Sequence, residues 1–210
     1  GRMVATSSPI LRGDHVLVAR ADGSLTRFDL HDGSAQVLAE LEAAPSTDLT
    51  QEGGRCFLGI DGGQVRLLDC ETGETIRQAQ LEDIATYRWL HVELEGEDAL
   101  WVGHTGVDGP GRRLVALDAE TLELRWEHRP PGENNAWTTA QPARLGVWIV
   151  AGDREGSLHA LDAKTGDPAW ELSVGQGPRV VRAIGDELWV GSFDGQLIAF
   201  RRVGVGRSSH

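Results

Sequence analysis

Histidine is the side chain most often used to bind a metal or to transfer a proton near neutral pH, and six histidines are spread through the interior of this sequence. They occur at His15, His31, His91, His104, His128 and His159. No two of them form a His-x-x-x-His or His-Glu-x-x-His pattern, the spacing that brings two ligands to one face of a helix. The sequence therefore predicts no metal site.

Nucleophilic catalysis also lacks its usual pattern. The Gly-x-Ser-x-Gly nucleophile elbow is absent from the sequence. Gly62-Gly63-Gln64 is typical of a hairpin turn and has no following helix that could bind phosphate. Asp153 and Asp194 recur at equivalent hairpins, which favours turn formation over paired acid–base catalysis. We expect no catalytic residue and no cofactor.

The two cysteines, Cys56 and Cys70, are too few for a disulfide scaffold and lack the clustering of a zinc or iron–sulfur site. Neither lies beside a plausible base. They flank the hairpin at Gly62-Gly63 and could lie near one another on adjacent strands. We expect ordinary buried thiols, which leaves the redox compartment open.

An internal repeat in the sequence indicates the secondary-structure elements that position these residues. Its best copies are residues 114–121 and 158–165, each followed five positions later by a tryptophan, Trp126 or Trp170. Weaker copies cover residues 26–33, 67–73 and 197–201. The equivalent positions Asp29, Asp69, Asp118, Asp162 and Arg201 are 39 to 49 residues apart. That period is typical of one propeller blade per repeat.

Within each repeat, short apolar segments are joined by turns, and Asp-Gly recurs at Asp22-Gly23, Asp61-Gly62 and Asp194-Gly195. Asp-Gly between alternating segments is the strongest short hairpin signal, because both central residues of a type I′ turn need positive φ. The sequence predicts an all-β, five-bladed β-propeller of four-stranded antiparallel blades, with no helix longer than about two turns. We expect one domain over residues 1–210, with blades at 6–44, 45–84, 85–132, 133–176 and 177–205.

Residues 116–121 through Trp126, and residues 160–166 through Trp170, resemble the tryptophan-docking repeat of the PQQ-like β-propellers. The resemblance covers nearly the whole chain and implies that both tryptophans are mostly buried between blades. The sequence departs from the family pattern at Leu122, where the family has glycine. It departs again at Val37 and Arg77, which occupy two tryptophan places.

The resemblance does not imply the quinone cofactor. Family members that carry it use a larger ring, a calcium ion and, in many cases, adjacent cysteines, which this chain lacks. The fifth repeat has no outer strand of its own. Residues 1–5, through Met3-Val4-Ala5, are the favoured segment to complete that blade, and Val203-Gly204-Val205 is the alternative.

In a propeller, the connections leading into the inner strands open on one face. The candidate binding residues in these connections are Tyr87, Arg88, Trp89, Asn134, Trp137, Arg179 and Arg182, with Thr47-Asp48 beside them. Aromatic, amide and guanidinium groups suit a polar ligand, a carboxylate or a protein loop. The alternative is that the arginines form surface ion pairs of little energetic value. Trp101, Trp148 and Trp189 are expected to pack between blades.

The net charge of −12 repels a nucleic-acid backbone or an anionic membrane, so we expect neither as a partner. No apolar run reaches the length of about 18 residues needed for a transmembrane helix, and residues 1–6 lack signal-peptide character. We expect a cytoplasmic protein. Lys164 is the single lysine among 20 basic residues, which is typical of a high-GC bacterial source.

These observations favour a non-catalytic propeller that binds a protein or peptide partner, as a sensor or scaffold module of a longer bacterial polypeptide. A propeller that binds a small ligand or carbohydrate, with Trp89 and Trp137 as stacking platforms, is the alternative. A propeller hydrolase or lactonase is third.

Overall fold

The computed structural model describes residues 7–96, 98–106, 112–133 and 135–201, and within them every regular element is a β-strand. The prediction of an all-β chain is confirmed. None of the described segments is a helix long and apolar enough to cross a bilayer. The chain divides into two compact units, residues 1–137 and 138–210, which are described separately below. The single-domain organisation stays a prediction.

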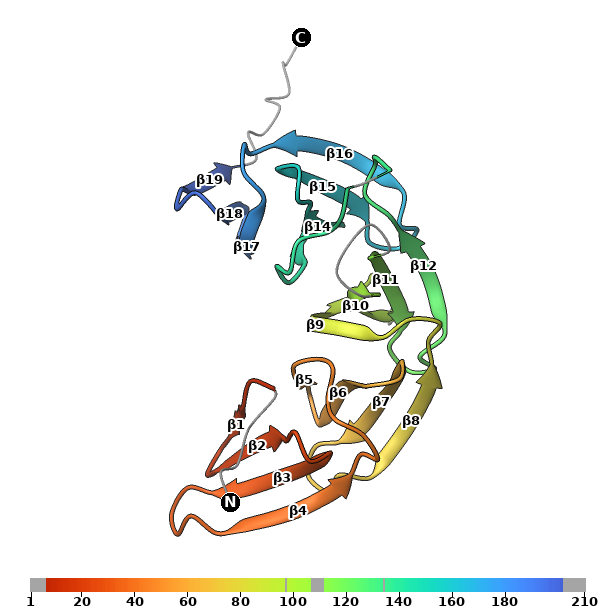
Figure 1. Ribbon diagram of the computed structural model, residues 1–210, viewed down its shortest axis with the longest axis vertical. Helices are drawn as coiled ribbons and strands as arrows, with labels where there is room; N and C mark the ends of the chain where they lie inside the picture. Colours follow the sequence, from red (N-terminus) through yellow and green to blue (C-terminus); the bar gives the residue numbers. More distant parts are fainter. Residues whose placement is uncertain (1–6, 97, 107–111, 134, 202–210) are drawn as a thin grey trace. The chain divides into compact units, whose positions relative to one another are not determined.

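The first unit holds three antiparallel sheets, each with four strands in sequential order (Figure 1). The first sheet contains β1 (Ile10–Arg12), β2 (His15–Ala19), β3 (Ser24–Asp29) and β4 (Ala35–Glu40). The second contains β5 (Thr50–Glu52), β6 (Arg55–Ile60), β7 (Gln64–Asp69) and β8 (Thr75–Gln80). The third contains β9 (Ala85–Glu93), β10 (Ala99–Thr105), β11 (Arg113–Asp118) and β12 (Leu124–His128).

The second unit holds two sheets of the same kind. One contains β13 (Ala143–Leu145), β14 (Trp148–Gly152), β15 (Ser157–Asp162) and β16 (Pro168–Ser173). The other contains β17 (Pro178–Ile184), β18 (Glu187–Ser192) and β19 (Leu197–Arg201). Four-stranded sheets are therefore confirmed for four repeats, and the fifth has three strands in the described part of the chain. Residues 1–5 and 203–205, predicted to complete it, lie outside the described residues.

The repeated aspartate forms the turn between the third and fourth strands of each complete sheet. The Asp69 carboxylate accepts the backbone N–H groups of Glu71 and Thr72, both at 2.8 Å. Asp29, Asp118 and Asp162 accept the corresponding pairs of N–H groups. Such side-chain hydrogen bonds to the following backbone are the reason aspartate is favoured in turns. The repeat signal in the sequence is thus a turn signal.

Leu122 stands in the turn position that is glycine in the other three complete sheets. Its φ is 61°, in the left-handed region, beside 72° at Gly33 and 76° at both Gly73 and Gly166. The Leu122 side chain is only 1% exposed and belongs to the core between the second and third sheets. Burial of the side chain compensates for the unfavourable backbone conformation.

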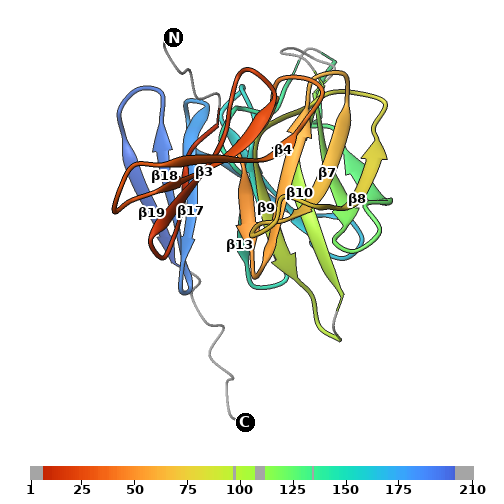
Figure 2. The same cartoon turned by 90° about the horizontal axis from the view of Figure 1, so that it is seen from below.

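The core of the first unit lies between successive sheets, and Figures 1 and 2 both show the sheet β5–β8 beside the sheet β9–β12. Between them Phe57 stacks on Trp101 with ring centroids 5.0 Å apart. Trp126 is 7% exposed, in agreement with its predicted docking role. In the second unit Trp170 is only half-buried and meets Trp148 edge to face, with centroids 5.8 Å apart.

Cys56 and Cys70 form a disulfide bond, which corrects the prediction of free buried thiols. Cys56 lies on β6, and Cys70 follows β7, its antiparallel neighbour. The backbone N–H of Cys70 donates to the carbonyl of Gly54, so the ladder continues past the strand and holds the two Cα atoms 5.3 Å apart. Cysteine spacing alone could not show which side of each strand the two sulfur atoms share.

Candidate functional site

One of the predicted binding residues, Arg88 on β9, takes part in a hydrogen-bonded network with residues before β1 and β5. Its Nε donates to Asp48 Oδ2 at 2.5 Å, and its Nη2 donates to Ser8 Oγ at 2.6 Å. The backbone N–H of Ser8 donates to Asp48 Oδ1 at 2.7 Å. The structure thus brings Arg88 and Asp48 together where three inner strands begin. The Arg88 charge is paired, as the alternative interpretation of the arginines expects.

Trp89 does not line a surface, and the prediction that it offers a stacking platform is corrected. Its side chain is 0% exposed and packs against Phe57, with ring centroids 4.9 Å apart. A Cβ atom added at Gly103 would lie 2.4 Å from the indole, so the ring occupies the space above that glycine. The prediction failed because β9, at nine residues, is longer than the other inner strands and places Trp89 mid-strand.

Trp137 is also fully buried, which corrects the second predicted stacking platform. Its indole N–H donates to the carbonyl of His128 at 3.2 Å, and its own carbonyl accepts from Arg112 Nη1 at 3.0 Å. The ring lies 6.3 Å from the ring of His104. Trp137 therefore anchors the chain after β12. Asn134 and the Tyr87 side chain lie outside the described residues.

Arg179 and Arg182 both lie on β17 in the second unit and are exposed. Arg182 Nη1 donates to Gln141 Oε1 at 2.9 Å. The Arg179 guanidinium lies 5.6 Å from the ring centroid of Phe193, within the range of a cation–π contact. Phe193, in the β18–β19 turn, is 59% exposed and was not predicted from the sequence. The sequence feature that could have indicated its exposure is its position directly before the Asp194-Gly195 hairpin.

A histidine–carboxylate pair occurs in the second unit, and its carboxylate also stabilises a hairpin turn. His159 Nε2 lies 2.6 Å from Asp153 Oδ2, and both side chains are buried. Asp153 Oδ1 accepts the backbone N–H of Ser157 at 2.8 Å, which is the turn role predicted for Asp153. The Ser157 hydroxyl donates to Glu171 instead of to the imidazole. Ser157 is therefore not placed as a nucleophile activated by His159.

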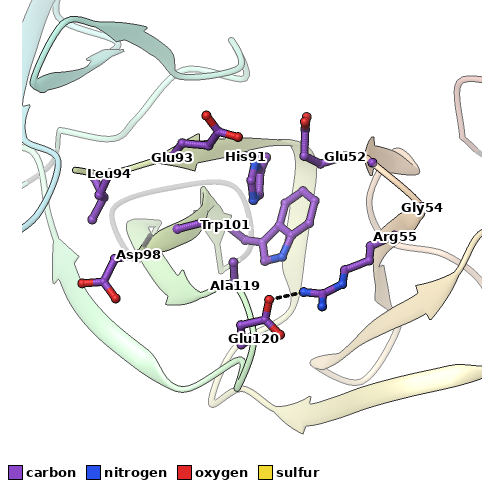
Figure 3. Close-up of a pocket in the computed structure, with 12 residues that line it drawn as sticks. Glu52, Gly54, Arg55, His91, Glu93, Leu94, Asp98, Trp101, Ala119 and Glu120 are labelled. Atoms are coloured by element: carbon purple, nitrogen blue, oxygen red, sulfur yellow. Dashed lines mark hydrogen bonds and ion pairs between the residues drawn. The ribbon is translucent and has the colours of Figure 1, made fainter. Parts of the chain in front are cut away.

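The first unit also contains a pocket that the sequence did not predict, with a volume of about 550 Å³. It lies at the turns that follow β5, β9 and β11, so β9 begins at the predicted face and ends at this pocket. The lining includes His91 and Trp101, whose rings are 4.7 Å apart (Figure 3). Burial lowers the pKa of His91, although Glu52 and Glu93 act to raise it.

A second hollow of similar volume surrounds Arg113, whose guanidinium is paired within the chain. Arg113 forms ion pairs with Glu82, Asp83 and Glu127. Burial would lower the pKa of Arg113, but these carboxylates raise it above its usual value. The cluster joins the second sheet to the third. Among the described residues, no group of three or more His, Cys, Asp or Glu side chains could hold a metal ion.

Comparison with known families gives a match over residues 40–203, to the family described as "Outer membrane protein assembly factor BamB". The chain belongs to this family. The match covers the repeats that resemble PQQ-like propellers, so that resemblance is confirmed.

Two relatives with this name come from Bordetella pertussis and Burkholderia pseudomallei. The first is 27% identical over 80% of this chain and 41% of the relative. The second is 28% identical over 96% of this chain and 64% of the relative. The chain thus spans about half the length of the curated relatives it matches.

Solved structures confirm the β-propeller fold. BamB from Moraxella catarrhalis has a TM-score of 0.70 at 20% identity, with 96% of this chain and 60% of that chain covered. The β-propeller domain of Cps50 (Swd1) from Myceliophteria thermophila has a TM-score of 0.70 at 18% identity, with 100% and 70% covered. The five sheets of this chain are therefore propeller blades.

The cytoplasmic location predicted from the sequence is wrong. The matching relatives are named outer membrane protein assembly factors, which conflicts with the cytoplasm. The Cys56–Cys70 disulfide agrees with this correction, because such bonds persist in oxidising compartments and are rare in the cytosol.

Proposed function

We propose that this chain is a non-catalytic, protein-binding part of an outer membrane protein assembly factor, and that its partner contacts the surface around Arg179. The family supports the general role, because the relatives bear that name. The observation that carries the choice of surface is the Arg179 guanidinium, which lies against the exposed ring of Phe193.

The surface around Arg179 has the composition of a protein contact. Phe193 is 59% exposed in the β18–β19 turn, and Arg179 and its neighbour Val180 are both exposed on β17. Arg179 has no carboxylate partner within the described residues, so its donors remain available to a ligand. Arginine and aromatic residues are enriched in the energetically important centres of protein interfaces.

The chemistry of this surface indicates the kind of partner segment it binds. Phe193 and Val180 provide apolar contact, and the planar guanidinium of Arg179 suits a carboxylate or a pair of backbone carbonyls. Arg88 and Arg182 remain further candidates for the same role. Trp89 and Trp137, the stacking platforms proposed for a propeller that binds a small ligand or carbohydrate, are buried, so they do not support that alternative.

The proposal is tested by affinity capture from a detergent-solubilised cell envelope of the source organism, followed by quantitative mass spectrometry. We expect Arg179→Glu and Phe193→Ala to lose envelope assembly proteins that the unmodified chain retains. Arg129→Glu, a charge reversal at an exposed arginine of the first unit, is the matched control. Equal recovery by all four proteins would place the contact elsewhere.

A further inference from the structure

We propose that the pocket at the turns after β5, β9 and β11 binds a basic side chain of a peptide, while the indole N–H of Trp101 donates to that peptide's backbone carbonyl. The pocket is lined by residues of the first unit alone. The proposal is therefore independent of the surface around Arg179.

The first observation is a buried donor that nothing in the described chain satisfies. The Trp101 side chain is 1% exposed, and its Nε1 atom has no hydrogen-bond partner among the described residues. Leaving a buried donor unsatisfied is costly, so native structures rarely do so without a reason. Trp101 lines the pocket, and a ligand carbonyl there would supply the missing acceptor.

Another tryptophan of the chain shows how such a donor is satisfied internally. Trp189 Nε1 donates to Glu187 Oε2 at 3.1 Å, two positions earlier on the same strand. The residue two positions before Trp101 is Ala99, which has no side-chain acceptor. Ala99 on β10 holds the position that Glu187 holds on β18. Ala99 also lines the pocket, so its small side chain leaves open the space that a glutamate would occupy.

The second observation is the charge of the pocket's rim. Its acidic residues are Glu52, Glu93, Asp98 and Glu120, against one arginine, Arg55. Glu120 pairs with Arg55, and Asp98 lies 3.8 Å from Arg125. Glu52 and Glu93 have no ion-pair partner within the described part of the chain. Figure 3 shows them on either side of His91 along one rim.

Access to the indole N–H is controlled by a movable pair of side chains. In Figure 3 the nitrogen of Trp101 lies on the side of the ring that faces Arg55 and Glu120. The Arg55 and Glu120 side chains are 42% and 68% exposed. An ion pair this exposed contributes little to stability, so a ligand carbonyl can displace it at small cost.

These features select a cation over the other ligand classes. The excess of carboxylates disfavours an anion, and the described residues hold no cluster that could bind a metal ion. Glu52 and Glu93 suit a guanidinium or ammonium group, and the net charge of −12 attracts such a group from a distance. A basic residue within a peptide combines that cation with the carbonyl that Trp101 requires.

The test uses ¹⁵N-labelled protein and follows the seven tryptophan indole signals by NMR. The Trp101 signal is assigned by its loss in Trp101→Phe. The protein is titrated with acetyl-Gly-Arg-Gly-amide and with the matched peptide that carries citrulline, a neutral analogue of arginine. We expect a saturable shift of the Trp101 signal with the arginine peptide, and weaker binding of the citrulline peptide.

Variants separate this site from general attraction to an acidic protein. Glu52→Gln/Glu93→Gln should weaken the arginine peptide by about 2- to 30-fold, from two ion pairs of about 0.2–1 kcal/mol each. Glu74→Gln/Glu155→Gln makes the same change in net charge at exposed positions elsewhere and should leave binding unchanged. Ala99→Gln should move the Trp101 signal without peptide and reduce the further shift on titration.

Four results would overturn the proposal. One is a Trp101 signal that does not move up to the solubility limit of the arginine peptide. Another is equal affinity for the arginine and citrulline peptides. The third is an equal loss of affinity in the two double variants, which would show attraction to net charge alone. Stronger binding of acetyl-Gly-Glu-Gly-amide would replace the cation with an anion as the ligand.

Discussion

At the scale of single residues, the four repeated aspartates, Asp29, Asp69, Asp118 and Asp162, serve to form turns. The carboxylate of Asp69 accepts backbone N–H groups of Thr72 and Glu71, which hold its pKa below the usual range. At Asp118, burial would raise the pKa, but the N–H groups of Thr121 and Glu120 outweigh it and lower the pKa. Folding therefore favours the ionised forms of Asp69 and Asp118.

The lowered pKa values predict a specific loss of stability in acid. For a carboxyl whose folded pKa lies below its unfolded value of about 3.9, the stabilisation is fully present above that value and is lost as the pH falls through the folded pKa. Asp69→Asn should lower the free energy of unfolding by about 1 kcal/mol at neutral pH and flatten its decline below about pH 4. Urea unfolding between pH 2 and 7 measures this, with Asp61→Asn as the control. An unchanged acid slope in Asp69→Asn would contradict it.

Two opposing effects act at Leu122, and their relative magnitudes decide whether its replacement raises or lowers the stability of the protein. Leu122→Gly relieves a left-handed backbone worth about 1–2 kcal/mol, but it also removes a buried side chain whose loss costs about 2–5 kcal/mol. We expect a net destabilisation of about 1–3 kcal/mol in urea unfolding. A stabilised Leu122→Gly protein would show that the side chain contributes little to the core.

At the scale of elements, the disulfide joins two neighbouring strands of one sheet and closes a short loop. Cys56 and Cys70 are 14 positions apart, and both are buried against the first sheet. A loop of this length predicts a stabilisation of about 3 kcal/mol. Reduction with dithiothreitol should lower the unfolding free energy of the native protein by about this amount. Cys56→Ala/Cys70→Ala should not respond to the reductant, and equal stability with and without reductant in the native protein would contradict the prediction.

The elements themselves were well predicted from the sequence, because hairpin turns have local chemistry. Asp61-Gly62 and Asp194-Gly195 mark turns that the structure confirms, and the alternating residues beside them form strands. The predicted type I′ geometry is wrong, because Gly62 and Gly195 have positive φ but Asp61 and Asp194 do not. Side-chain direction was predicted less well. The repeat predicts Trp89 in a connection, but β9 extends past it with a bulge opposite Val102–His104 that no local pattern reveals.

At the scale of the first unit, Asp48 connects the starts of three inner strands. It accepts hydrogen bonds from Ser8 and Arg88, which belong to segments 40 residues away on either side in the sequence. The repeat alone could place Arg88 near an inner strand, although the structure puts it on β9 and not in the connection before that strand. Their pairing could not, because Ser8, Asp48 and Arg88 meet only once the sheets are assembled.

A double-mutant cycle measures this connection. Asp48→Ala and Arg88→Ala should each destabilise the protein, and the double variant should lose less than the sum. Since Arg88 is 47% exposed, we expect a coupling of about 0.5–1 kcal/mol. Strict additivity in urea unfolding would show that the pair contributes nothing to the assembly of the sheets.

Gly103 has a consequence for how this family can change during evolution. Because the indole of Trp89 occupies the place of a Cβ atom there, a side chain at position 103 requires a smaller residue at position 89. A side chain introduced first at position 103 would clash with the indole, and a smaller residue introduced first at position 89 would leave a cavity. Neither substitution is therefore well tolerated alone. In an alignment of descendants of this sequence, the two positions should change together.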